Sequence, residues 1–334
     1  NLFKFDLSSN NEFESILLKI IKDYLPVATL ESYKKLTLFI KELPWPKNPK
    51  FILTANSFSG NDVYKFWIAD KVEGGSPYFV CQHGFGYLEY VDKRMKVEFK
   101  TSDKFFSWGW GREQSKVSPM TMQMSHMKHN KRSDPTGPIL WAETAPQPFV
   151  VRTDNVACGD CDLNFILQQK HFLNAICSEA YKLLLMRLYP VDYGWNEKEQ
   201  LEDIYPSLKF SRGEIFTFPQ QIRRSRLCVH GYFGTTWLET LSMNFPTVVF
   251  WDLNRVHTLA SVQPYLDALR RLKILHDTPE SAAEFVNEIY EDPLLWWMSS
   301  ELQQVKDKFC HLFARTSKNW LKEWKEELLK MAKI

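Results

Sequence analysis

Residues 227–252 constrain the fold more than any other stretch, because they read as a strand, a turn, a helix and a second strand. The apolar run Leu227–Val229 leads into a turn bracketed by Gly231 and Gly234, and the helical pattern that follows stops at Pro246. A second apolar run comes directly afterwards. Two strands of one sheet that are joined through a helix run parallel. We therefore expect a parallel sheet with helices on its faces.

Strands and helices alternate elsewhere as well. In the first half, short apolar strands are predicted at Phe51–Ala55, Tyr78–Cys81 and Lys104–Trp108, and a helix at Val63–Val72. Residues 111–160 read as irregular. We predict an α/β protein with two Rossmann-like doubly wound domains, residues 1–148 and 149–334, facing each other across a cleft.

Composition excludes several classes of function. Lys plus Arg number 42 against 40 Asp plus Glu, and a net charge of +2 gives no electrostatic case for nucleic acid. No apolar run reaches the roughly 18 residues of a membrane-spanning helix. Of six cysteines only Cys158 and Cys161 are closely spaced. They are either free thiols or a pair with a redox or metal-binding role. The chain starts at Asn1, and we expect that part of the protein precedes it.

The Thr235–Thr236 pair opens the helix of the central unit. A helix start offers free backbone N–H groups and the positive end of a dipole, which suit a phosphate. The alternative is a plain helix cap. Glu239, three residues after Thr236, either completes a capping box or accepts hydrogen bonds from ribose hydroxyls. With Gly234 and His230, which precede the helix, these residues are candidates for binding a donor nucleotide.

Polar loops follow two strands of the first half. Gln82, His83 and Gly84 come after the strand at 78–81, where a histidine can act as a base or bind phosphate, or can simply bond to its turn. Asn61 and Asp62 come after the preceding strand, where Asp62 is a candidate base or nucleophile and a helix cap is the alternative.

Four further residues complete the candidate site. Arg187 stands near a strand end, where it can pair with a diphosphate or a sugar carboxylate, and a surface ion pair is the alternative. Tyr193 follows it in the loop YPVDYGW. Trp108 can stack on a sugar or pack in the core, and Glu98 is a second candidate carboxylate, of uncertain placement.

Known motifs narrow the chemistry further. The P-loop pattern GxxxxGK[ST], the nucleophile elbow GxSxG and a dinucleotide-binding GxGxxG are all missing from the sequence. No DxD motif stands where a metal-dependent sugar-nucleotide transferase would carry one. We therefore predict neither a metal nor a cofactor.

Several segments taken together resemble a family of bacterial surface-carbohydrate transferases found in lipopolysaccharide and capsule gene clusters. They are HGYFGTTWLETLSMNFPTVVFWD, RLYPVDYGW, QHGFGY with FFSWGWG, and DTPESAAEFVNEIYEDPLLWW with FARTSKNWLKEW. The resemblance covers about Lys50 to Trp324. The family is similar to glycosyltransferases of the two-domain GT-B type, and it looks related to transferases that use CMP-activated ulosonic acids such as Kdo.

This resemblance implies roles for the two halves. The C-terminal half would bind the sugar nucleotide, with 234–236 at a phosphate, Glu239 near the ribose and Arg187 in the same pocket. The N-terminal half would bind the acceptor, with His83 and the Asn61–Asp62 loop reaching the sugar. Relatives more often have a Gly-Gly pair after the histidine, and Phe85 narrows the loop in this chain.

Three functions remain open from the sequence. The first is a metal-independent glycosyltransferase that moves a sugar to a surface-glycan acceptor, with Asp62 or Glu98 as nucleophile if the reaction retains configuration. The second is a polyol-phosphate transferase with a CDP-linked donor, and the third a non-catalytic carbohydrate-binding protein. We expect a cytoplasmic protein at the inner face of the membrane, where Lys128–Arg132 or Trp320–Ile334 could touch a lipid-linked acceptor's membrane.

Overall fold

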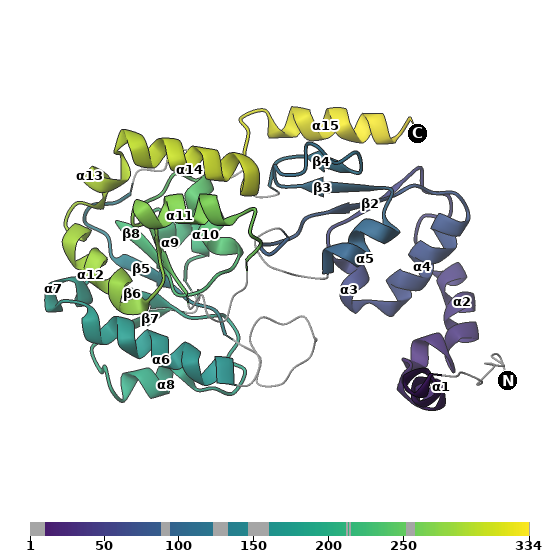
Figure 1. The fold of residues 1–334 in the computed structure, drawn as a ribbon, viewed down its shortest axis with the longest axis horizontal. Coiled ribbons are helices and arrows are strands. Elements are labelled where there is room, and N and C mark those ends of the chain that lie inside the picture. The colour runs from purple at the N-terminus through teal and green to yellow at the C-terminus, as the bar shows by residue number, and fades with distance from the viewer. Residues whose placement is uncertain are drawn as a thin grey trace. The chain divides into compact units, whose positions relative to one another are not determined.

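The computed structural model describes residues 11–87, 94–122, 133–145, 160–211, 213, 215–251 and 258–333. By its internal contacts the chain divides into two compact units, Asn1–Val80 with Ile334, and Cys81–Lys333. Both units combine helices and strands (Figure 1). The predicted basic loop at 128–132 and Cys158 lie outside the described residues.

The first unit is mainly helical. It contains α1 (Glu12–Tyr24), the 3-10 helix η1 (Val27–Thr29), α2 (Tyr33–Glu42), α3 (Ser57–Gly60) and α4 (Asp62–Glu73). Strand β1 (Ile52–Thr54) pairs in parallel with β2 (Tyr78–Cys81). The predicted strands at 51–55 and 78–81 and the helix at 63–72 are thus confirmed, each with ends within two residues.

The second unit begins with two short paired strands. Strands β3 (Lys104–Ser107) and β4 (Val117–Pro119) are parallel, and α5 (Arg94–Thr101) precedes them. The predicted strand at 104–108 is therefore confirmed. The sequence interpretation of 111–160 as irregular is wrong for β4, because a three-residue strand is too short to show an alternating pattern.

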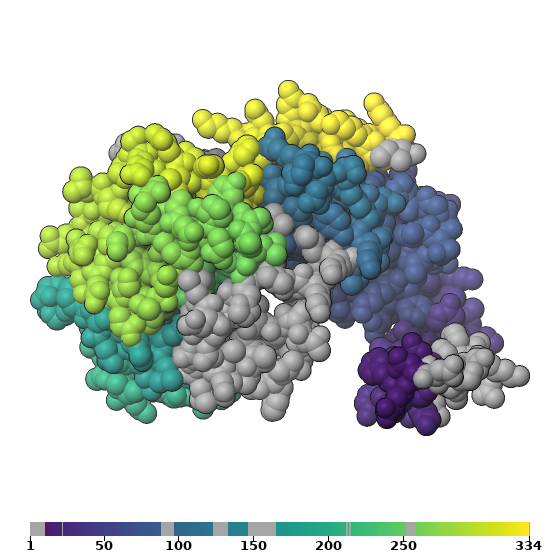
Figure 2. Space-filling model, viewed as in Figure 1, coloured from purple at the N-terminus to yellow at the C-terminus, as the bar shows by residue number. Residues whose placement is uncertain are grey.

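The last helix, α15 (Trp320–Met331), packs against β3 and β4. Trp324 Nε1 donates to Thr121 Oγ1 over 3.0 Å, and Lys104 Nζ on β3 lies 2.9 Å from Glu327 Oε1. The space-filling view shows α15 in yellow against the blue β3–β4 segment (Figure 2). The side of α15 that carries Trp324 and Met331 is therefore turned toward protein.

A six-stranded sheet forms the core of the second unit. Its order is β10-β9-β8-β5-β6-β7, and all its pairings are parallel. The strands are β5 (Ile139–Ala142), β6 (Leu184–Arg187), β7 (Lys209–Ser211), β8 (Leu227–His230), β9 (Thr247–Phe250) and β10 (Leu275–His276). The helices are α6 (Asp160–Ala175), α7 (Ser178–Tyr181), α8 (Glu197–Glu202), α9 (Phe218–Ile222), α10 (Thr235–Ser242), α11 (Gln263–Arg271), α12 (Pro279–Ile289), α13 (Pro293–Trp297) and α14 (Ser300–Phe313).

Both faces of this sheet are buried under helices. On β5, Ile139 and Trp141 pack in one apolar cluster with Phe172 of α6, and residues of α12 join that cluster. The alternate residue Leu140 packs with Ile222 of α9 and with Phe245 on the other face. Successive side chains of a strand point to opposite faces, so this alternation shows a doubly wound sheet. The predicted α/β class with two parallel sheets is confirmed.

Strand β5 corrects the sequence analysis. It lies inside residues 111–160, which were interpreted as irregular, and it pairs with β6 and β8 of the six-stranded sheet. A run of four apolar residues that is buried on both faces shows no periodicity, so the pattern could not reveal it. The boundary at residue 148 remains a prediction, and β5 lies before it.

Candidate functional site

The central pair of strands, β5 and β8, marks the reversal point of the sheet. The chain builds β5, β6 and β7 outward on one side and then returns to place β8, β9 and β10 on the other. Ala142 lies opposite His230 at the carboxyl ends of this pair. Open parallel sheets bind ligands beyond the carboxyl ends of strands at such a reversal. The topology therefore places a candidate site at the residues that follow, Glu143 and Gly231.

Helix α10 begins at this edge. Gly234 precedes it as the cap residue, without a side chain to bond the first N–H groups. Thr235 and Thr236 form the first helical positions, and both are half-buried. The predicted turn is thus open in part to solvent, and its free N–H groups and dipole favour an anion.

The loop after β2 lies against this helix start. The Phe85 backbone N–H donates to Thr235 Oγ1 over 3.1 Å. A methyl group on Gly84 would lie 3.3 Å from the same oxygen. The structure therefore brings together the two segments that the sequence analysis singled out separately. Because the Thr235 hydroxyl oxygen accepts from Phe85, its own proton can point to a ligand.

A chain of polar contacts runs beneath the turn. The Tyr232 hydroxyl bonds to Thr236 Oγ1, which lies 3.4 Å from His230 Nδ1. His230 Nε2 lies 3.1 Å from Thr240 Oγ1 and 3.3 Å from Cys228 Sγ. Burial lowers the pKa of His230 to about 3, so its ring is neutral. His230, predicted to bind the donor, lies fully buried under the turn.

Aromatic rings surround the same turn. Phe233 packs edge-on against Phe85, with ring centroids 3.9 Å apart, and stacks on Trp237 at 5.4 Å. Trp251, which follows β9, lies 3.5 Å from Phe233 by the same measure. These contacts fix the loop after β2 to the start of α10.

Glu239 lies one turn into α10, and it is 9% exposed. Burial raises the pKa of its carboxyl to about 7. Within the described ranges no side-chain hydrogen bond or ion pair is formed by this carboxyl. The capping box, one of the two alternatives given for Glu239, is therefore not formed, and no side chain among the described residues caps α10.

Arg187 ends β6 and is held by the segment before α9. Its Nη1 donates to the Phe216 carbonyl over 3.1 Å and to Gln221 Oε1. Its guanidinium lies 6.0 Å from the Phe218 ring centroid. Gly213 leaves room for it, since a methyl group there would meet Nη2 at 2.5 Å. Arg187 thus has protein partners at the same sheet edge as the helix start.

Glu143 is a site residue that sequence reasoning missed. It follows β5 and packs against Gly231, where a methyl group would lie 2.0 Å from Glu143 Oε1. It is 5% exposed. The sequence carried one weak signal, the apolar run ILWA ahead of a Glu-Thr pair, which is consistent with a buried strand but does not identify one.

Two predicted contact residues serve the second unit's own structure. Gln82 Oε1 accepts from the Trp108 backbone N–H at 2.9 Å and from Trp110 Nε1 at 2.8 Å. Its Nε2 donates to the Gly84 carbonyl over 3.0 Å. Trp108 is buried and packs in the same cluster as Trp237. The alternative given for Trp108, core packing, therefore describes its place in this structure.

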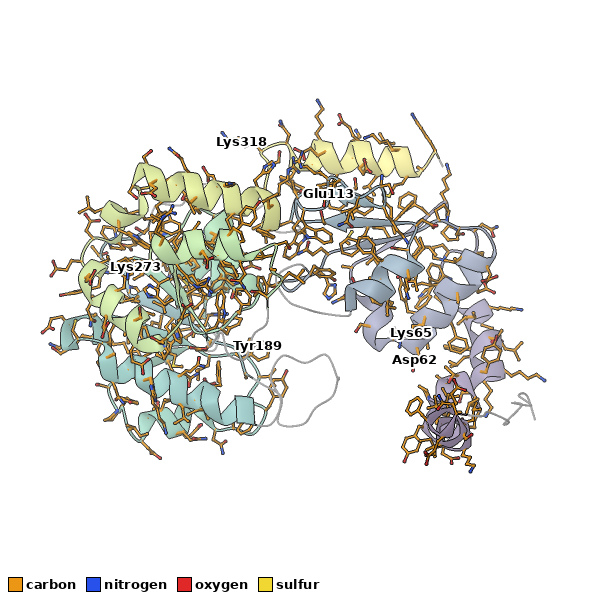
Figure 3. All side chains as sticks on the ribbon, in the orientation of Figure 1. Asp62, Lys65, Glu113, Tyr189, Lys273 and Lys318 are labelled. Carbon is orange, nitrogen blue, oxygen red and sulfur yellow. The ribbon has the colours of Figure 1, made fainter. Side chains whose placement is uncertain are left out.

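His83, Glu98 and Tyr193 are the other predicted residues of the second unit. His83 Nδ1 lies 2.5 Å from the Tyr87 hydroxyl. Glu98 is buried on α5. Tyr193 stacks on Tyr189, with ring centroids 6.0 Å apart. Tyr189, which follows β6, is labelled in Figure 3.

Asn61 and Asp62 belong to the first unit. Asn61 Oδ1 accepts from the Tyr64 N–H over 3.0 Å as the cap of α4. Asp62 forms an exposed pair with Lys65 at 2.9 Å, and Figure 3 shows the two side chains next to each other. Their predicted part in catalysis stays a prediction.

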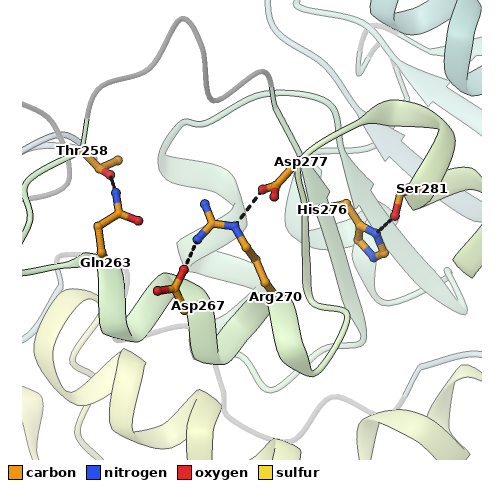
Figure 4. Close-up of polar contacts among 7 residues, drawn as sticks. All are labelled: Thr258, Gln263, Asp267, Arg270, His276, Asp277 and Ser281. Carbon is orange, nitrogen blue, oxygen red and sulfur yellow. Dashed lines mark hydrogen bonds and ion pairs between the residues drawn. The ribbon is translucent and has the colours of Figure 1, made fainter.

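A second polar cluster lies at the end of β10, where it connects neighbouring elements (Figure 4). Arg270 Nε is 2.7 Å from Asp277 Oδ1, and its Nη1 is 2.6 Å from Asp267 Oδ1. His276 Nδ1 lies 2.9 Å from Ser281 Oγ. Burial lowers the pKa of His276 to about 4, so it is neutral at pH 7. These contacts tie α11, β10 and α12 together.

The described part of the chain contains neither a metal-binding cluster nor a helix suited to span a membrane. Within it, no three or more His, Cys, Asp or Glu residues are grouped to hold a metal ion. None of the helices described has the length and apolar character needed to cross a membrane.

The model of the LIC12162 family of transferases matches residues 1–328. The chain belongs to this family. The predicted resemblance to a transferase family is thus confirmed, and the lipopolysaccharide, capsule and ulosonic-acid assignments stay predictions. No match was found among curated proteins.

Solved structures resemble this LIC12162-family chain in part. The calicheamicin glycosyltransferase CalG4 has a TM-score of 0.48 at 10% identity, covering 96% of this chain and 83% of that one. The UDP-GlcNAc 2-epimerase from Neisseria meningitidis has a TM-score of 0.47 at 11% identity, covering 99% of this chain and 84% of that one. The wall teichoic acid polymerase TagF has a TM-score of 0.40 at 10% identity, covering 78% of this chain and 68% of that one.

Proposed function

We propose that this transferase takes its transferred group from a nucleotide-linked donor and binds the donor's phosphate at the start of α10. The transferred group is a sugar, with a CMP-linked ulosonic acid as the first donor to test, and the acceptor is a surface glycan carried on a lipid. The family match supports the reaction class. The reversal of strand order at β5 and β8 supports the location.

One observation carries this proposal. The half-buried Thr235–Thr236 pair opens α10 beside the strand-order reversal, and no side chain in the described part of the protein caps the helix start. An anion there would receive backbone N–H bonds and the Thr235 hydroxyl proton, and it would face the positive end of the helix dipole. The same interactions stabilise a phosphate as it leaves, which transfer from a nucleotide requires. This chemistry uses protein groups alone.

Isothermal titration calorimetry with CMP, CDP, UDP and GDP tests the proposal. We expect at least one nucleotide to bind the wild-type chain. Failure of all four to bind would refute the donor site. Binding of a glycan alone would favour the carbohydrate-binding alternative. For the active protein, product mass separates the two transfers, since a polyol phosphate adds phosphorus to the acceptor and a sugar does not.

Thr235→Val is expected to lower the affinity for the best-binding of these nucleotides about tenfold, because one hydrogen bond to a charged group is lost while the side-chain shape is kept. Thr101→Val is the matched control, since Thr101 is exposed at the end of α5 and its hydroxyl donates to the Val97 carbonyl. Equal affinities of Thr235→Val and wild type would remove this hydroxyl from the site.

A further inference from the structure

Glu143 packs directly beneath the turn that leads to α10. A methyl group on Gly231 would lie 2.0 Å from Oε1, 2.7 Å from the carboxyl carbon and 2.9 Å from Oε2. Only glycine can therefore stand at position 231 with the carboxyl in this place. Gly231 lies three residues before the cap residue of α10. The carboxyl is thus a neighbour of the proposed phosphate site.

The carboxyl of Glu143 is buried, with donors nearby but none in full hydrogen-bonding geometry among the described residues. Both of its oxygens are inaccessible to solvent, and no donor among the described residues is in hydrogen-bonding geometry with either of them. A buried carboxylate in this state costs several kcal/mol, which is avoided when the group carries its proton. Such a group is uncommon in a stable core and is found more often where it has a function.

The surroundings of Glu143 favour its protonated form. Burial, and next the charge of Glu197 on α8, raises the pKa of Glu143 well above its usual value. Three nearby donors, the side chains of Trp141 and Gln169 and the Thr144 backbone N–H, favour the ionised form and so lower this pKa more weakly, although none reaches full hydrogen-bonding geometry. Gln169 Nε2 of α6 also donates to Glu197 Oε1 over 2.5 Å, so it lies between two acidic side chains.

Tyr232 connects this carboxyl with the helix start. Its hydroxyl bonds to Thr236 Oγ1, the second helical residue. Burial raises the pKa of Tyr232, and the charges of Glu143 and Glu239 raise it further, against the opposing bond to Thr236. A negative charge on Glu143 is therefore felt at the turn where a phosphate would sit.

We propose that Glu143 is a positioning residue of the donor site, and that the anionic donor binds only while the Glu143 carboxyl holds its proton. This inference rests on the proposed function. When neutral, the carboxyl supports the Gly231 turn and leaves the positive end of α10 unopposed. When ionised, it places a negative charge under the phosphate and disfavours the donor. Donor binding is consequently coupled to one proton.

The coupling has a definite sign. Above the pKa of Glu143 in the free protein, binding requires uptake of a proton, so affinity falls by up to about tenfold for each pH unit. Glu143→Gln keeps the shape and is neutral at every pH. We expect it to bind as wild type does at low pH and to lose this fall at high pH. A purely structural role of Glu143 would not produce this difference.

The experiment measures Kd by calorimetry between about pH 5 and 9, with the nucleotide that binds the wild-type chain best among CMP, CDP, UDP and GDP. Glu199→Gln, an exposed carboxyl on α8, is the matched control and should follow wild type. Glu239→Gln identifies the part of the pH dependence that belongs to the second buried acid near the turn. Thermal unfolding of each variant checks folding.

The outcomes separate the two proposals. Nucleotide binding by wild type with the same pH dependence in Glu143→Gln would overturn the role of Glu143 alone. No nucleotide binding by wild type would instead overturn the donor site. If Glu143→Gln does not fold, proton uptake by Glu239→Gln is measured in two buffers of different ionisation enthalpy. Uptake on nucleotide binding at high pH supports the inference, and zero uptake overturns it.

Discussion

Gly231→Ala is expected to lower the free energy of unfolding by about 1–3 kcal/mol, the usual cost of overpacking a core, and to weaken nucleotide binding by more than tenfold. The new methyl group would lie 2.0 Å from Glu143 Oε1. The carboxyl cannot simply turn away, because it is enclosed by protein. Either it or the Gly231 turn must therefore move, and the turn leads to the proposed phosphate site. Urea unfolding and calorimetry measure the two effects.

A second substitution shows whether this clash is the cause. Adding Glu143→Ala to Gly231→Ala removes the group that the methyl meets. The double variant should therefore lose less stability than the sum of the losses in the two single variants. Gly137→Ala is the matched control, because a methyl there meets the backbone carbonyl of Arg224, also at 2.0 Å. Glu143→Ala should not rescue it. Equal rescue of both glycine variants would contradict the proposed contact.

The parts of the fold that the sequence predicted well have clear boundaries. Strand β2 ends at a polar loop, and β8 and α10 lie between glycines and a proline, so short patterns sufficed. Strand β5 has four apolar residues and no alternation, because both of its faces are covered. Its place at the centre of the sheet depends on pairing with β6 and β8, which no local pattern contains.

The candidate site shows the same limit. Thr235, Thr236 and the loop after β2 could be selected from residue types at strand and helix ends. Their contact, the Phe85 N–H bond to Thr235, joins residues 150 positions apart and follows only from the fold. The contact between Glu143 and Gly231 likewise follows from the pairing of β5 with β8, which brings the ends of the two strands together. Chemistry at a strand end can be proposed from sequence, whereas its neighbours require the sheet order.

Glu239→Gln is expected to remove a pH-dependent loss of stability of about 3 kcal/mol. Burial raises the pKa of Glu239 to about 7 in the folded protein, against 4.5 for an unperturbed glutamate. The native state thus holds its proton where the unfolded state has lost it. The contribution of protonated Glu239 to stability is fully present below about pH 4.5 and is lost as the pH rises through about 7. Above that pH the loss stays constant, at about 1.4 kcal/mol per unit of pKa difference.

Urea unfolding between about pH 4.5 and 8 measures this effect as the difference between Glu239→Gln and wild type. That difference should grow in favour of the glutamine variant up to about pH 7 and then level off, since other titrating groups are common to both proteins. Glu284→Gln, an exposed carboxyl on α12, should show no such trend. A difference independent of pH would show that Glu239 is already ionised in the folded chain. The family resemblance implies that ionised Glu239 accepts hydrogen bonds from the ribose hydroxyls, whereas the inference for Glu143 requires a neutral carboxyl, so the two acids are expected to impose opposite pH dependences on donor binding.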